Sequence, residues 1–185
     1  MTCVIRVLAL SVVAAAIVLV LIPATATQVP PSSLRVGNQS LAPASCATRD
    51  TLWIHHYMAA LYVPARESPV IALQDPKRAK ALQVQILNKS FLPRELPKKW
   101  RRTLEEQLDQ KSLTSVGAAW KELSVGDRVT IAYVPGPGVS LKVNDRLVAT
   151  TPNHQLIEAM LRTWAEGETV SERVTRTVAK HPCRL

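Results

Sequence analysis

Residues 49–64, with the sequence RDTLWIHHYMAALYVP, form the longest stretch rich in β-branched and aromatic residues outside the N-terminal segment. Residues of these types favour extended backbone. The stretch ends at Pro64, which cannot donate a hydrogen bond to a sheet ladder. It therefore predicts one long, buried strand around which the other elements pack.

The two faces of this predicted strand differ in chemistry. Because side chains alternate along a strand, one face carries a cation, a hydroxyl and aromatic rings: Arg49, Thr51, Trp53, His55 and Tyr57. The other face is mainly apolar: Leu52, Ile54, His56 and Met58. The apolar face fits a core, and the mixed face is typical of a pocket floor for an amphipathic ligand. In the alternative interpretation, Arg49 lies at a solvated strand end and the aromatic rings pack beneath a helix.

The N-terminal segment has the pattern of an export signal. Arg6 precedes an uncharged apolar run over residues 7–22, and small residues follow at 24–26. We predict a signal peptide over residues 1–26, cleavage after Ala26, and an exported protein that is periplasmic or secreted. Residues 27–33 then read as a flexible lead-in, and residues 34–185 as one domain. The alternative is that the apolar run stays as a membrane anchor.

The chain is strongly basic, with a formal net charge of +9 that falls to +8 if Arg6 is removed with the leader. Such a charge favours anionic partners, namely lipid head groups, carboxylate ligands or nucleic acid. We expect no nucleic acid partner, because the chain is exported and carries no recognition motif. The basic cluster Lys98, Lys99, Arg101 and Arg102 reads as a solvated helix face, and peripheral contact with an anionic membrane is the alternative. The oligomeric state stays unknown.

Two cysteines, Cys46 and Cys183, remain after the leader. In an oxidising compartment such a pair favours a disulfide, which would join the segment before the long strand to the C-terminus. Two buried, unpaired thiols are the alternative.

The order of the expected elements is strands, helices, strands, helices, without a repeated βαβ unit. This order predicts an α+β domain with an antiparallel sheet. Strands are expected at 34–41 as a hairpin, 49–64, 79–87, 128–134, 139–143 and 147–149, and helices at 68–75, 92–108, 113–123, 156–164 and from 171 to 178.

Motifs for metal, phosphate or nucleophile chemistry are weak. His55 and His56 are strand neighbours that point to opposite faces, and no cysteine or acid lies at ligand spacing. The sequence over residues 135–138 reads as a hairpin turn, because it lacks the lysine and helix of a phosphate loop. No serine nucleophile elbow is present, and His154 and His181 have no motif that supports a catalytic base. We expect no metal and no cofactor.

Three segments together resemble the chalcone isomerase-like domains of exported bacterial proteins. Residues 49–64 resemble the family's arginine followed by an aromatic strand ending AALYLP. Residues 126–144 resemble its GD, YVPG-turn and VN meander, and residues 156–171 resemble its helix with tryptophan, glycine and serine. Trp100 also matches a tryptophan of the family, and the resemblance runs from Leu34 to about Val178.

The resemblance implies an open-faced β-sandwich, in which helices cover one side of a curved antiparallel sheet and a cleft lies between. The family contains enzymes that close a chalcone into a flavanone, and non-catalytic relatives of which some bind fatty acids. Both groups have a ligand-facing arginine, which Arg49 matches, although residues 43–47 replace the glycine-rich turn that usually precedes it. Tyr57 aligns with a threonine of the enzymes and resembles the tyrosine of the fatty-acid binders.

The enzymes also use a tyrosine and an asparagine from the helical region, and neither occurs between Phe91 and Asp109. The resemblance therefore favours a non-catalytic protein that binds a small amphipathic acid, with Arg49 and Tyr57 at its head group and Thr151 adding a hydroxyl. An isomerase of the intramolecular lyase type is the alternative, and it would need a group such as Tyr133 to reach the cleft. An accessory protein that binds a macromolecule through its basic face is a third hypothesis.

Overall fold

The structure, a computed structural model, describes residues 29–51, 54–89, 92–96, 98–165 and 183 of the 185-residue chain. Its described residues form one seven-stranded antiparallel sheet in which the strands follow one another in chain order. The strands are β1 Leu34–Val36, β2 Gln39–Thr51, β3 Ile54–Pro64, β4 Lys80–Ile86, β5 Arg128–Val134, β6 Gly138–Val143 and β7 Arg146–Thr151.

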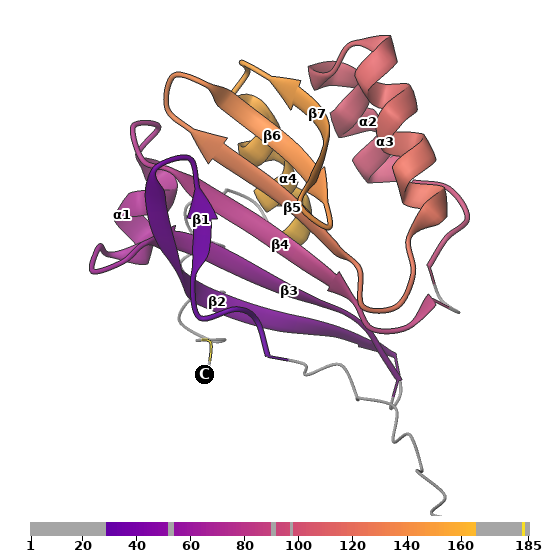
Figure 1. Cartoon of the computed structure of the whole chain (residues 1–185), viewed down its shortest axis with the longest axis horizontal. Coiled ribbons are helices and arrows are strands. Elements are labelled where there is room, and N and C mark those ends of the chain that lie inside the picture. The colour runs from indigo at the N-terminus through magenta and orange to yellow at the C-terminus, as the bar shows by residue number, and fades with distance from the viewer. Residues whose placement is uncertain (1–28, 52–53, 90–91, 97, 166–182, 184–185) are drawn as a thin grey trace, which may run out of the picture.

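Four helices accompany the sheet among the described residues: α1 Pro69–Gln74, α2 Lys98–Gln107, α3 Gln110–Glu122 and α4 Gln155–Ala165. Figure 1 shows α4 behind the central strands, with α2 and α3 as a pair beside β6 and β7. Helix α4 contacts β4, β5 and α2, and α3 contacts β7. This architecture confirms the predicted α+β class, with helices packed against one face of an antiparallel sheet.

The main hydrophobic core lies between the sheet and the helices. Alternate positions of neighbouring strands supply it, because side chains on one face recur every second residue. Its sheet side includes Ala59, Leu61, Val63, Leu82, Val84, Ile86, Val129, Ile131 and Tyr133. Its helix side includes Leu104, Val116, Leu156, Ile157, Met160 and Leu161.

A smaller cluster covers the opposite face of the sheet. It consists of Val36, Leu41, Ala60, Tyr62, Ala79, Ala81 and Ala132, with Leu34, Cys46 and Val134 packed against it. The sheet curls so that β1 contacts β5, and Gly37 of the β1–β2 turn lies beside the Val134 side chain. The curl closes the small cluster and gives the sheet the curved form that the resemblance implied.

The prediction of one long strand over residues 49–64 is wrong. Strand β2 ends at Thr51 and β3 begins at Ile54, so Arg49 belongs to β2 and Tyr57 to β3. The sequence of β2, QSLAPASCATRDT, is rich in small and polar residues and did not suggest a strand. Pairing with β3 along almost its whole length stabilises it, because strand formation depends more on neighbouring strands than on intrinsic propensity.

One predicted helix is shorter in the structure, and two other predictions concern residues that the structure does not describe. Helix α2 begins at Lys98 instead of residue 92, since Pro93 and Pro97 disfavour helical backbone in the residues before them. The expected signal peptide over 1–26 and the expected helix over 171–178 lie outside the described residues. Within the described residues, no helix is both long enough and apolar enough to span a membrane.

The disulfide between Cys46 and Cys183 is formed, with 4.9 Å between the two Cα atoms. It joins β2 to the C-terminal end of the chain, as the cysteine count predicted. Cys46 packs with the smaller cluster, so the bond lies on the side of the sheet away from the main core. Near it in the same cluster, the Tyr62 hydroxyl donates to the carbonyl of Pro31 at 3.1 Å and holds the lead-in against the sheet.

Candidate functional site

Arg49 and Tyr57, the two residues predicted to hold a ligand head group, are direct partners across the β2–β3 ladder. Residues directly opposite one another in an antiparallel pair share a face of the sheet. The expectation that they share a face therefore holds, but the cause is strand pairing and not spacing along one strand. The structure describes the backbone of Arg49 and not its side chain.

Tyr57 is half-buried and packs against the main core, on the face that the helices cover. Its other neighbour in the sheet is Ile86 of β4, which is fully buried. The shared face of Arg49 and Tyr57 is thus continuous with the apolar layer between sheet and helices. A cationic residue, a phenol and an apolar surface therefore come together at this position.

A β-bulge next to Tyr57 fixes this end of β3. Arg49 pairs with Tyr57 and Asp50 pairs with His55, so His56 is the extra residue of the bulge. The His56 carbonyl accepts hydrogen bonds from the backbone N–H of Leu87 at 2.9 Å and of Asn88 at 3.1 Å. These bonds tie the bulge to the segment that follows β4, and they hold the backbone beside Tyr57 in a defined position.

An apolar space lies between the helical pair α2–α3 and strands β5 and β6. Its lining includes Leu96, Trp100, Leu104, Val116, Ala119, Trp120, Leu123, Val129, Ile131, Leu141, Val143 and Met160. Trp100 and Trp120 meet edge to face inside it, with 5.8 Å between ring centroids. The space measures about 20 Å³, so side chains fill the cleft in this conformation. Its β5 wall lies two strands from Tyr57, or about 10 Å across the sheet.

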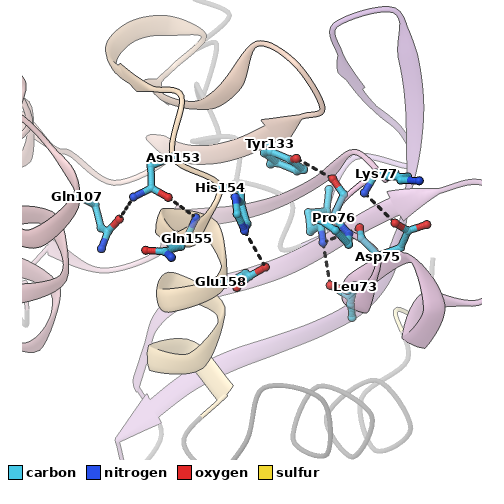
Figure 2. A network of polar contacts seen from close by, with 11 residues as sticks. Leu73, Asp75, Pro76, Lys77, Gln107, Tyr133, Asn153, His154, Gln155 and Glu158 are labelled. Carbon is cyan, nitrogen blue, oxygen red and sulfur yellow. Dashed lines mark hydrogen bonds and ion pairs between the residues drawn. The ribbon is translucent and has the colours of Figure 1, made fainter.

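A few polar contacts hold α2 and α3 over this space. Asn153, just before α4, donates its side-chain amide to the Gln107 side-chain oxygen at the end of α2, at 2.5 Å (Figure 2). At the end of α3, Arg146 of β7 lies 3.7 Å from Glu122 in an exposed ion pair. Exposed pairs contribute little to stability, so packing is the main force that keeps the helical pair closed.

Thr151, predicted to add a hydroxyl to the ligand pocket, lies away from Arg49 and Tyr57. It ends β7, four strands from β3, which is about 19 Å across the sheet. The residue is buried, and its hydroxyl oxygen accepts a hydrogen bond from the Asn153 backbone N–H at 3.3 Å. Thr151 therefore supports the turn that leads into α4, and it does not lie near Arg49 or Tyr57.

Tyr133, the residue that an isomerase would need in the cleft, also lies at the far end of the sheet. Its partner is Lys80 at the start of β4, whereas Tyr57 pairs with Ile86 at the end of β4. Six residues of strand separate these positions, or about 20 Å. The Tyr133 hydroxyl donates to the Pro76 carbonyl at 2.7 Å (Figure 2). It therefore supports a turn and does not approach Arg49.

Lys80 forms a buried polar site that the sequence did not reveal. Its side chain is 1% exposed, and its ammonium donates to the carbonyls of Leu73 at 2.8 Å and of Asp75 at 3.2 Å. The ammonium also lies 5.8 Å from the centre of the Tyr133 ring. Burial lowers the pKa of Lys80, against the opposing charges of Glu158 and Asp75. These contacts fasten α1 and the following turn to the sheet, which is a structural role.

The histidines have different surroundings. His55 is exposed and His56 is buried in the bulge. His154, before α4, lies 4.0 Å from Glu158 and beside the Tyr133 ring (Figure 2). In the part of the chain that the structure describes, no group of three or more His, Cys, Asp or Glu residues could hold a metal ion.

The comparison with protein families agrees with the sequence resemblance. The family model described as chalcone isomerase-like matches residues 24–176. No curated protein matches the chain. Among solved structures, a fatty-acid binding protein of Arabidopsis thaliana aligns over 80% of this chain and 92% of its own, with 13% sequence identity and a TM-score of 0.47.

Proposed function

The chain belongs to the chalcone isomerase-like family, and on this premise we propose that it is an exported, non-catalytic protein that binds a small amphipathic acid such as a fatty acid. The direct pairing of Arg49 with Tyr57 on the helix-covered face carries the proposal. A guanidinium offers a planar pair of donors to a carboxylate, and a phenol adds a third donor. In partly buried surroundings these charge-assisted hydrogen bonds are strong enough to select an acid.

The apolar tail of the ligand would extend from Tyr57 over Ile86 and Val129 towards Trp100 and Trp120. Tyr57 and Ile86 are neighbours in the sheet, and Val129 lines the apolar space beneath the helices. All of these side chains belong to or pack against the main core. The path is therefore apolar from the head group to the tail.

Ligand uptake on this account requires α2 and α3 to move away from the sheet. The apolar space measures about 20 Å³, whereas small-molecule sites usually measure about 300–1,000 Å³. The conformation described here is then a closed one. Opening exposes Trp100 and Trp120, and an acyl chain can replace the contacts that they lose.

The alternative, an isomerase acting on a chalcone-like substrate, needs further polar groups near Arg49. Tyr133, the group considered for that purpose, lies about 20 Å away along the sheet, and Thr151, predicted to line the ligand pocket, lies about 19 Å away across it. An arginine and one phenol suffice to bind an acid, whereas the enzymes that the chain resembles add a tyrosine and an asparagine from the helical region, and neither occurs between Phe91 and Asp109. Binding without catalysis is therefore the function that we propose.

Native mass spectrometry of the protein recovered from cells without detergent tests the proposal. We expect a co-purifying acid on the natural protein, and its loss from an Arg49→Ala variant. Arg35→Ala is the matched control, because Arg35 is an exposed arginine on the edge strand β1. A ligand that stays bound to Arg49→Ala, or that leaves both variants equally, would contradict the proposed site.

A further inference from the structure

A second, larger hollow lies on the surface between the segment after β4 and the C-terminal end of α3. We call it the α3 groove. It encloses about 620 Å³, within the range of small-molecule sites, whereas the apolar space beneath the helices holds about 20 Å³. Its lining consists of Lys89, Leu92, Pro93, Arg94, Glu95, Trp120, Lys121 and Leu123.

The floor of the α3 groove is apolar and held in place. Leu123 is buried, and Leu92 and Trp120 are half-buried. The Trp120 indole N–H donates to the Pro93 carbonyl at 3.0 Å, which fastens the segment after β4 to α3. The two walls of the groove are therefore joined directly by a hydrogen bond.

The rim of the α3 groove carries an excess of positive charge. Lys89, Arg94 and Lys121 are exposed, and none of them forms an ion pair with a carboxylate within the described part of the chain. Glu95 is the single acid of the lining, and it is paired with Arg101 at 2.5 Å. The hydrogen bond and the charge of Arg101 lower the pKa of Glu95, and the charge of Lys121 lowers it further, so this carboxylate stays ionised.

The basic cluster predicted from sequence on α2 differs from this rim. Arg101 pairs with Glu95, and Arg102 pairs with Glu106 at 3.2 Å. Lys98 is exposed at the start of the helix. Ion pairing thus neutralises part of the α2 cluster, whereas the three cations of the α3 groove all line one hollow.

We propose that the α3 groove binds a phosphorylated lipid, with its phosphate between Lys89, Arg94 and Lys121 and its chain over Leu92 and Trp120. A phosphate monoester carries close to two negative charges at pH 7 and three acceptor oxygens, which matches three cations better than a carboxylate does. The site uses neither Arg49 nor Tyr57, so its head-group contacts differ from those of the proposed function, although both proposals place an apolar chain against Trp120. Trp120 and Leu123 also line the apolar space beneath the helices, so a chain in the groove lies one side chain from the interior.

Isothermal titration with dodecyl phosphate below its micelle concentration tests this site. We compare the natural protein with the double variant Arg94→Glu/Lys121→Glu. The matched control is Lys98→Glu/Lys111→Glu, which changes the net charge equally at exposed helix positions outside the groove. We expect at least a tenfold loss of affinity in the groove variant and less than a twofold change in the control. The milder Lys121→Gln, expected to lose about threefold, keeps the test valid if charge reversal unfolds the protein.

Equal losses in the groove variant and the control would overturn the proposal, because net charge alone would then account for binding. Unchanged affinity in the groove variant would overturn it as well, as would equal binding of uncharged dodecyl maltoside. Sedimentation with phosphatidylcholine vesicles, with and without phosphatidic acid, distinguishes the two sources of the phosphate. A groove-dependent gain on acidic vesicles identifies a bilayer lipid, and groove-dependent binding of dodecyl phosphate alone identifies a monomeric one.

Discussion

Arg49 of β2 and Tyr57 of β3 are direct partners in an antiparallel ladder, on the face of the sheet that the helices cover. His56, the extra residue of the β-bulge, lies next to this pair in β3. Its backbone carbonyl accepts two backbone hydrogen bonds from the segment after β4. A cationic residue and a phenol are thereby brought to the border of the main core by backbone structure alone. The proposed function depends on this arrangement.

The hydroxyl of Tyr57 is expected to contribute to ligand affinity. Tyr57→Phe keeps the ring that packs against the core but removes one donor to a carboxylate, and hydrogen bonds to charged groups contribute about 1.5–3 kcal/mol. We therefore expect about a tenfold or greater loss of dodecanoate affinity by titration calorimetry. Tyr62→Phe, on the opposite face of the sheet, is the control and is expected to bind normally. Equal affinities of Tyr57→Phe and the natural protein would exclude the phenol as a ligand contact.

Gly138, at the end of the β5–β6 turn, is expected to tolerate no side chain. Its φ is +91°, and an added Cβ would contact the Thr151 carbonyl oxygen and lie 2.6 Å from the Pro152 Cα. We expect Gly138→Ala to lower the free energy of unfolding by more than about 2 kcal/mol, measured in urea. Gly117→Ala in α3 is the matched control, because a Cβ there meets no atom within 4 Å. It is expected to stabilise the protein by up to about 1 kcal/mol. The same loss in both variants would contradict the steric explanation.

Tyr62 is expected to make the protein less stable as the pH rises from 10 to 12. Burial raises its pKa to about 12, against the lowering effect of Arg128. Between the two pKa values the folded protein keeps a proton that the unfolded chain has lost, so the free energy of unfolding falls as the pH rises. Between pH 9 and pH 11 the fall attributable to this group is on the order of 1 kcal/mol. Denaturant titrations at pH 9, 10 and 11 should show a steeper fall for the natural protein than for Tyr62→Phe, and parallel curves would contradict the assignment.

The disulfide between Cys46 and Cys183 is expected to be a major source of stability. It closes a loop with a sequence separation of 137, for which the chain-entropy model gives about 5 kcal/mol. The double variant Cys46→Ala/Cys183→Ala should therefore unfold at a much lower urea concentration than the oxidised protein. The reduced natural protein should resemble the variant, since both lack the bond. If oxidised and reduced protein unfold at the same urea concentration, the bond does not contribute in this way.

Much of the fold could be predicted from local pattern. Alternation over 79–87 and 128–134 gave β4 and β5, and the two cysteines gave the disulfide. The middle of strand β2 was missed because its residues have low strand propensity and pair only through tertiary structure. Arg49 and Tyr57 were nonetheless assigned to a common face, because their even spacing along one supposed strand gave the same result as their true pairing across β2 and β3.

The remaining parts of the candidate sites depend on contacts between distant segments. Lys80 reads in the sequence as an ordinary lysine at the start of a strand, and its burial follows from the Leu73 and Asp75 carbonyls that surround it. Thr151 was assigned to the ligand pocket, and Tyr133 was named as a group that an isomerase would need there, without knowledge of the strand order, which separates both from Tyr57. The ion pairs of Arg101 with Glu95 and of Arg102 with Glu106 were likewise not predicted, because they depend on the folded chain.

A double-mutant cycle on dodecanoate binding tests the central claim most directly. Affinities are measured by titration calorimetry for the natural protein, Arg49→Ala, Tyr57→Phe and the double variant. If both residues hold one carboxylate, each single variant loses about tenfold or more in affinity, and the two losses are non-additive by about 0.5–3 kcal/mol. Natural affinity in both single variants, or strictly additive losses, would contradict a shared head-group site at Arg49 and Tyr57.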